Sequence, residues 1–104
     1  MPERRQFRPE WSGEVAVNDE GGRQQKLNYR FDLIDPHAIY LLAGVLSAGA
    51  EKYGEENWRQ IPARDHVNHA IEHLYAWLAG DTNEPHMSHA LTRVMFAQAV
   101  DGLD

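Results

Sequence analysis

The chain has 104 residues, of which 42% are hydrophobic, and a formal net charge of −6. This predicts one globular domain of modest size, and the charge disfavours nonspecific binding to nucleic acid or to an anionic membrane surface. The lack of cysteine excludes disulfides and thiolate chemistry. The sequence contains no secretory hydrophobic segment and no apolar run of the roughly 18 residues that a membrane helix needs, so we expect a cytoplasmic protein.

The first part of the chain is polar and interrupted by glycine, which predicts an irregular arm over residues 1–28. The arm is expected to hold at most a short hairpin around Glu14–Val17. Trp11 is the residue there that should favour burial. The remaining residues, 29–104, are predicted to form the helical domain.

The first predicted helix starts after Asp35 and ends at Gly54. Asp35 is a favourable N-cap, and Pro36 at the first helical position has no N–H that needs an intrahelical partner. Gly54 provides the left-handed residue that ends many helices.

The second predicted helix runs from about Asp65 to Ala79 and stops at Gly80. Its apolar residues recur at helical spacing and form one stripe. They are Val67, Ala70, Ile71, Leu74, Trp77 and Leu78. Three histidines form a separate strip along the same helix: His66, His69 and His73. Glu72 is expected to point away from this strip.

The third predicted helix begins near Asn83–Pro85 and continues to about Val100. It is apolar on more than one side, which is typical of a central or interface helix. Three helices with short connections and no convincing strand predict an all-α bundle. The two-sided third helix and the small size of the chain indicate that it associates into a dimer or tetramer.

The histidines suggest a site at the turn between the second and third helices. An antiparallel pair of helices would bring His73, Asp81, Glu84 and His86 together at one end of the bundle. The acids also have a local explanation, because carboxylates are favoured near a helix N-terminus. The segment "HAIEH" matches the H-x-x-E-H zinc-protease pattern, but the short chain that follows leaves little room for a third ligand and a peptide-binding frame.

The segment "KYGEENWR" adds cationic and aromatic groups. Lys52 and Arg59 are suited to hold phosphates, whereas Tyr53 and Trp58 are suited to stack on a base. The alternative is purely structural: a helix end with a basic residue, a glycine stop and a tryptophan that folds back on the core.

Together these segments resemble the phage-type dATP/dGTP diphosphohydrolase family, a compact helical relative of the MazG-like nucleotide pyrophosphohydrolases. The resemblance covers about residues 29–97. It lies in Arg30–Leu33, Gly49–Arg59, His73–Asp81 and His86–Ala90. It implies a MazG-like all-α fold, a homo-oligomer and, for a phage-encoded protein, a place in the host-cell cytoplasm.

The resemblance also implies hydrolysis of a purine deoxynucleoside triphosphate, dATP or dGTP, to the monophosphate and pyrophosphate, with Mg²⁺ or Mn²⁺ as cofactor. Asp81 and Glu84 are the expected metal carboxylates, with Glu51 as a third candidate. His73, Asp81 and Glu84 are the expected catalytic residues.

The expected substrate-binding residues are of three kinds. They are Lys52 and Arg59 for the phosphates, Tyr53, Asn57 and Trp58 for the nucleoside, and His86 and His89 for metal, water or phosphate. His66 and His69 are expected to have no role in the site.

The acidic turn "GDTNEP" is shorter than is usual in that family, which keeps two alternatives open. One is a non-catalytic nucleotide- or metal-binding module on the same fold. The other is a helical protein–protein adaptor that uses the first helix, which is rich in small residues, and the apolar third helix as its contact surface.

Overall fold

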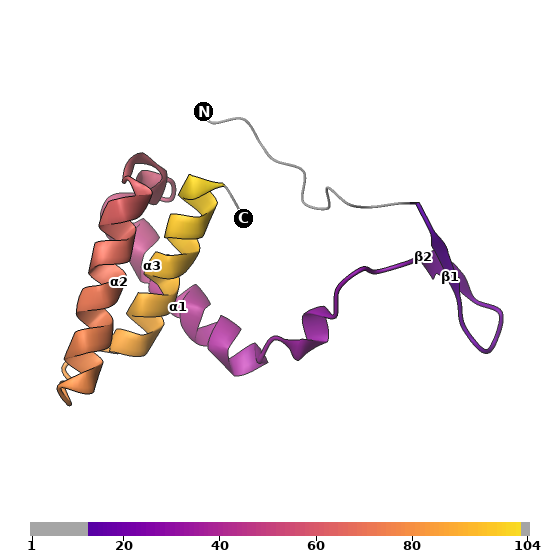
Figure 1. Cartoon of the computed structure of the whole chain (residues 1–104), viewed down its shortest axis with the longest axis horizontal. Coiled ribbons are helices and arrows are strands. Elements are labelled where there is room, and N and C mark those ends of the chain that lie inside the picture. Colours follow the sequence, from indigo (N-terminus) through magenta and orange to yellow (C-terminus); the bar gives the residue numbers. More distant parts are fainter. Residues whose placement is uncertain (1–12, 103–104) are drawn as a thin grey trace. The chain divides into compact units, whose positions relative to one another are not determined.

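The computed structural model of the chain describes residues 13–102, which form two units that meet in the sequence at Leu33 and Ile34. The first unit contains a hairpin and a short 3₁₀ helix, and the second contains three α-helices (Figure 1). This confirms the predicted all-α fold with an irregular N-terminal arm. No helix among the described residues is long and apolar enough to cross a membrane.

The first unit begins with the hairpin. Strands β1 (Val15–Val17) and β2 (Arg23–Gln25) pair antiparallel, and the side chain of Asn18 accepts two backbone N–H groups of the turn at 3.0 and 2.8 Å. Gly21 adopts a φ of 83°, which a residue with a side chain rarely takes. The short hairpin expected near Val15 is confirmed, while Trp11 lies outside the described residues.

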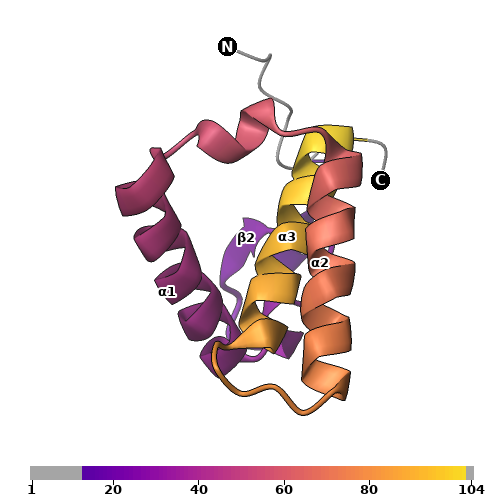
Figure 2. The ribbon, with the colours of Figure 1, turned by 90° about the vertical axis from the view of Figure 1, so that its left-hand side faces the viewer.

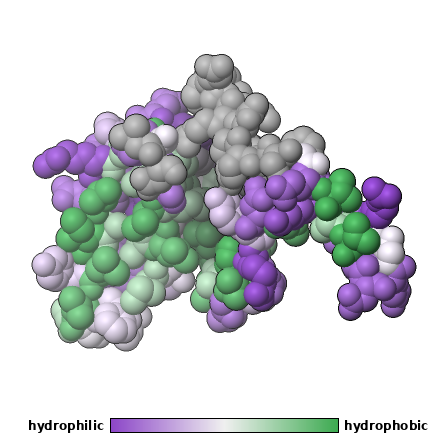
Figure 3. All heavy atoms as spheres, turned by 45° about the vertical axis from the view of Figure 1, so that its right-hand side comes forward, coloured by the Kyte–Doolittle hydropathy of each residue, from purple (hydrophilic) through white to green (hydrophobic). Residues whose placement is uncertain are grey.

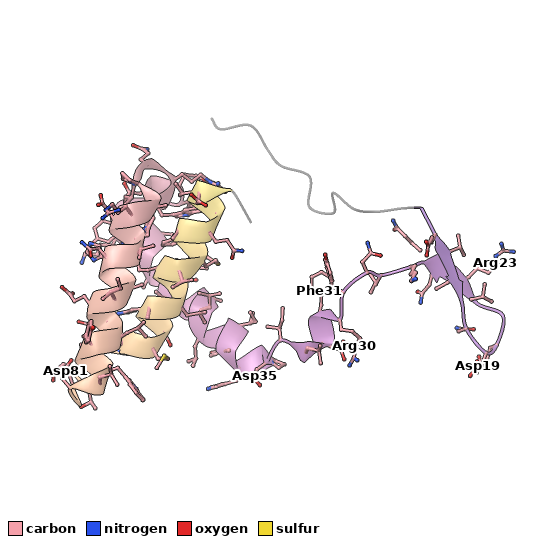
Figure 4. The ribbon with its side chains drawn as sticks, in the orientation of Figure 1. Asp19, Arg23, Arg30, Phe31, Asp35 and Asp81 are labelled. Atoms are coloured by element: carbon pink, nitrogen blue, oxygen red, sulfur yellow. The ribbon has the colours of Figure 1, made fainter. Side chains whose placement is uncertain are left out.

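The 3₁₀ helix η1 (Phe31–Leu33) follows, and its first turn is closed by an ion pair. The guanidinium of Arg30, which is labelled in Figure 4, donates two hydrogen bonds to the Asp32 carboxylate, at 2.9 and 2.7 Å. These hydrogen bonds lower the pKa of Asp32. The pair is exposed to solvent, so it contributes to local order more than to stability.

Helix α1 (Pro36–Tyr53) opens the second unit and has the predicted ends. The Asp35 side chain accepts the backbone N–H of Ala38 at 3.0 Å, and Gly54 ends the helix with a φ of 96°. A 3₁₀ turn, η2 (Asn57–Gln60), then leads toward the second helix.

Helices α2 (Ala63–Leu78) and α3 (His86–Asp101) are close to their predicted positions. α2 begins two residues earlier than expected, directly after Pro62, whose fixed φ is compatible with a helix start. Gly80, with a φ of 86°, ends it as predicted.

α2 and α3 run antiparallel and pack along their length, whereas α1 diverges from this pair (Figure 2). α1 approaches the start of α3 at one end, and residues 54–62 bridge the space at the other end. Small side chains line the α2–α3 contact, where Ala70 and Ala90 are both buried. Their size lets the two backbones approach closely.

The apolar stripe predicted on α2 is present, but in the single chain Ala70 is its one buried member. Leu74 is 40% exposed and Leu78 is 69% exposed, and Leu91 on α3 is 45% exposed. Figure 3 shows hydrophobic side chains over the outside of the helical unit. Most of the surface that the stripe was expected to bury is therefore left uncovered by the described helical unit, residues 34–102.

These exposed residues form one face. In an antiparallel pair of helices, the residue that follows a contact residue points to the same side of the pair on both helices. Five of the members follow, by one residue or about 100°, a residue that is buried or that contacts the other helix, and Leu78 lies about one turn beyond Leu74. We name this the apolar face, and its members are Val67, Leu74, Leu78, Met87, Leu91 and Val94.

Candidate functional site

A cleft of about 1240 Å³ lies between α1, η2, α2 and α3. It exceeds the roughly 300–1,000 Å³ of a typical small-molecule site, so it has room for a nucleotide. Many predicted site residues line it. They are Lys52, Tyr53, Asn57, Trp58, His73, Glu84 and His89.

A compact group of two histidines and one carboxylate lies in the cleft where α2 ends and α3 begins. His89 Nδ1 donates to Glu84 Oε1 at 2.9 Å, and His73 Nδ1 lies 3.6 Å from the same oxygen. One ligand atom from each of these three residues lies within 4.8 Å of the others. The antiparallel turn thus brings His73, Glu84 and His89 into the geometry of a possible metal site.

The donor set fits a divalent metal. Metal–ligand bonds of about 2.0–2.2 Å place two ligand atoms at most about 4.4 Å apart, so small shifts would close the group on an ion. Two imidazoles and one carboxylate are typical ligands of transition metals, whereas Mg²⁺ prefers oxygen ligands alone.

His86 and Asp81 fix the protonation of His73 through a chain of hydrogen bonds. His86 is buried, and its Nε2–H donates to the carboxylate of Asp81, which lies at the C-terminal end of α2 (Figure 4). A neutral His86 then carries its lone pair on Nδ1, which lies 2.9 Å from His73 Nδ1. His73 must therefore donate its Nδ1–H to His86, which leaves a lone pair on His73 Nε2.

The pKa of His73 is lowered from 6.5, chiefly because burial disfavours the charged imidazolium. Neighbouring His89 lowers it as well, and the Glu84 carboxylate opposes them by raising it. His73 is consequently neutral near pH 7 and keeps its lone pair for a metal or a proton.

These opposing effects predict the titration of His73 in the metal-free protein. Its imidazole should titrate below 6.5, and Glu84→Gln should lower its pKa further because a favourable charge is removed. His89→Gln should raise the pKa of His73, since the interaction with His89 that lowers it is lost. NMR titration of the ring C–H resonances measures both shifts, and a change of the same sign in the two variants would contradict this arrangement.

The other two predicted metal carboxylates are not members of this group. Asp81 is occupied by His86 and stands outside the group formed by His73, Glu84 and His89. Glu51 is exposed on α1 and belongs to neither the group nor the cleft lining.

The aromatic and cationic residues around η2 are arranged around Trp58. The Phe96 ring is stacked on Trp58 with a centroid distance of 4.6 Å, and the Arg59 guanidinium lies 4.3 Å from the Trp58 centroid. Both faces of Trp58 are therefore covered. Arg59 pairs with Glu56 and does not line the cleft.

Tyr53 is less covered than Trp58, because the residue is 61% exposed at the edge of the cleft. Lys52 lies beside it, with Nζ 5.0 Å from the ring centroid. The hydrogen bond to Tyr53 is the main cause of a raised pKa for Lys52, which remains cationic at neutral pH.

His66 and His69, which were expected to have no role in the site, line the cleft. Glu72 lines it as well, although it was expected to point away from the histidine strip. His66 is the most deeply buried side chain among the described residues and contacts Arg93. Sequence reasoning missed this pair. The pair could have been predicted from the register of the two helices. His66 lies seven residues before His73, and Arg93 lies seven residues after His86, so the two pairs are in the same register of an antiparallel helix pair.

Comparison with known proteins agrees with the resemblance read from the motifs. The family model described as "dATP/dGTP diphosphohydrolase, N-terminal" matches residues 18–102, which include all three helices and the histidine–glutamate group. No curated protein and no solved structure matches the chain significantly.

Proposed function

The chain belongs to the dATP/dGTP diphosphohydrolase family, and from this premise we propose that it hydrolyses dATP or dGTP to the monophosphate and pyrophosphate with a divalent metal. The observation that carries the proposal is the group of His73, Glu84 and His89, which opens into a cleft with room for a nucleotide.

In this proposal His73, Glu84 and His89 hold the metal. A divalent ion in such a site neutralises phosphate charge and lowers the pKa of bound water. The mixed nitrogen and oxygen donors favour Mn²⁺ over Mg²⁺, because an imidazole is a poor ligand for the harder ion.

Asp81 acts through His86 as a positioning residue. Its carboxylate fixes the proton of His86 on Nε2, and His86 in turn fixes the proton of His73 on Nδ1. His73 Nε2 is thereby kept as a base that can accept a proton from water, whereas metal binding through Nδ1, the nitrogen 3.6 Å from Glu84 Oε1, would require loss of the Nδ1 proton.

The substrate is proposed to extend from this group toward the end of α1. Lys52 offers a cationic group for the phosphates, and exposed Tyr53 offers a ring for the purine. Trp58, covered on both faces, supports the pocket wall, with Asn57 beside it at the nucleoside end. Arg59 can reach a phosphate only by leaving Glu56.

We also propose a homo-oligomer built on the apolar face. Six large apolar side chains on one side of α2 and α3 are each at least 40% exposed, which is costly for a monomer in water. The cleft lining and the apolar face lie on different sides of the helix pair, so association through this face leaves the cleft accessible.

One observation favours the alternative of a binding module. The metal group contains a single carboxylate, whereas hydrolysis of phosphate esters with Mg²⁺ commonly relies on several. Such a module would bind a nucleotide with metal and release no pyrophosphate.

Pyrophosphate release separates the two functions. The four dNTPs and four NTPs are each incubated with Mn²⁺, Mg²⁺ or a chelator. The enzyme should release pyrophosphate from dATP or dGTP, faster with Mn²⁺ and not with chelator. Retained nucleotide binding without release under all conditions would establish the binding module instead.

A further inference from the structure

His66 is a completely buried histidine to which the proposed function assigns no role. Its side chain is 0% exposed, and its Nε2 lies 2.9 Å from the backbone carbonyl oxygen of Trp58. A carbonyl oxygen only accepts, so Nε2 carries the proton that is donated. The ring also packs at a tilt against Phe96, with centroids 5.2 Å apart.

The other ring nitrogen of His66 orients an arginine. Arg93 Nη1 lies 3.2 Å from His66 Nδ1. Because a guanidinium only donates, Nδ1 must hold a lone pair, and His66 is a neutral acceptor with both nitrogens occupied. The contact therefore fixes the position of Arg93 and leaves its positive charge uncompensated.

Arg93 keeps this charge within the cleft. Its side chain is half-buried and lines the cleft, and across residues 13–102 no carboxylate forms an ion pair with it. This contrasts with Arg59, which is paired with Glu56. In a chain with a net charge of −6, a half-buried cation without a described acidic partner is available to bind an anion in the cleft.

The position of Arg93 relative to the metal group suits a chain of phosphates. Arg93 follows His89 by four residues on α3, so the two side chains share a face and are about 6 Å apart along the axis. A guanidinium has several N–H donors in a planar fork that matches phosphate oxygens, and one of them is used on His66.

We propose that Arg93 binds the polyphosphate of the ligand and that His66 is the positioning residue that holds Arg93 in place. This inference rests on the proposed nucleotide function and adds to it the cationic residue that faces the metal group. Recognition by Arg93 is independent of the base, because it is directed at phosphate oxygens.

Binding of inorganic tripolyphosphate in the presence of Mn²⁺, measured by calorimetry, tests this residue apart from catalysis. Arg93→Gln should weaken binding by about 10- to 100-fold, as expected for loss of a charge-assisted contact. Mn²⁺ affinity without tripolyphosphate should stay unchanged. The matched control is Arg64→Gln, which removes the same charge from an exposed position on α2 outside the cleft lining.

His66 is tested by a conservative and a disruptive variant. A glutamine at position 66 can donate to the Trp58 carbonyl and accept from Arg93, so His66→Gln should retain tripolyphosphate affinity within about threefold. His66→Leu removes both contacts and should weaken it by about tenfold. Introduced into Arg93→Gln, His66→Leu should have no further effect, which distinguishes positioning from general damage to the fold.

Several outcomes would overturn the inference: unchanged affinity in Arg93→Gln, an equal loss in Arg64→Gln, or additive losses in the double variant. Failure of the proposed function is a separate result. If tripolyphosphate binding depends on Arg93 but no dNTP is cleaved, the anion site stands and the hydrolase does not.

Discussion

Replacing Glu84 by glutamine is expected to lower kcat/KM for dATP and dGTP by about 100-fold or more, the largest effect of any single substitution in the cleft. Glu84 is the one carboxylate in the metal group, and its Oε1 accepts the hydrogen bond from His89 at 2.9 Å. Glutamine retains an oxygen that can accept this bond, so the local structure should survive. What is lost is the negative charge that attracts a divalent cation.

Two measurements make this prediction specific. Manganese affinity, followed by calorimetry, should fall together with turnover, and part of the activity should return at high metal concentration. Glu72→Gln is the matched control, because Glu72 lines the same cleft and carries the same charge but lies outside the metal group. It should keep activity within about threefold, since a nearby charge in a wet cleft is largely screened.

An unchanged turnover in Glu84→Gln would remove the metal group from the mechanism. An equal loss in Glu72→Gln would show that the general negative potential of the cleft is what matters. His89→Gln gives an independent check, because it removes a nitrogen donor without changing the carboxylate.

Replacing Leu74 by glutamate is expected to dissociate the homo-oligomer. Leu74 lies in the middle of the apolar face and is 40% exposed within one chain. Burial of a leucine contributes about 1.5–3 kcal/mol, and a two-fold symmetric interface contains the residue twice. Because 40% of Leu74 remains to be buried at the interface, the two copies together contribute about 1.2–2.4 kcal/mol. The dissociation constant should therefore rise by about 10- to 60-fold, before the added cost of burying a carboxylate.

Sedimentation velocity over a range of concentrations measures this change. The matched control is Gln60→Glu, which adds the same charge at the exposed end of η2, away from the apolar face. It should leave the assembly intact. A parent protein that is monomeric at high concentration, or a Leu74→Glu variant that assembles normally, would contradict the proposed interface.

Much of the candidate site could be predicted because its members lie around one turn. Two helices joined by a few residues must pack antiparallel, so the end of α2 and the start of α3 are neighbours. This places His73, Asp81, Glu84 and His86 together. The order within the group was not predictable, because side-chain rotamers decide that Asp81 contacts His86 and that Glu84 faces His89.

The sequence by itself determined the helices and their ends. Asp35 caps α1, and Gly54 and Gly80 end α1 and α2, because these effects depend on backbone dihedrals and hydrogen bonds within one turn. The family resemblance was likewise local, because it was carried by short motifs, and the matching family model confirms the family.

The tertiary structure alone decided which long-range partners meet. The divergence of α1 opens the cleft, Phe96 covers a face of Trp58, and His66 holds Arg93 from 27 residues away. It also left the apolar stripe of α2 exposed, because α1 does not cover that side of the helix pair. These features depend on the angles and registers at which helices pack, which are set by contacts summed over the whole unit.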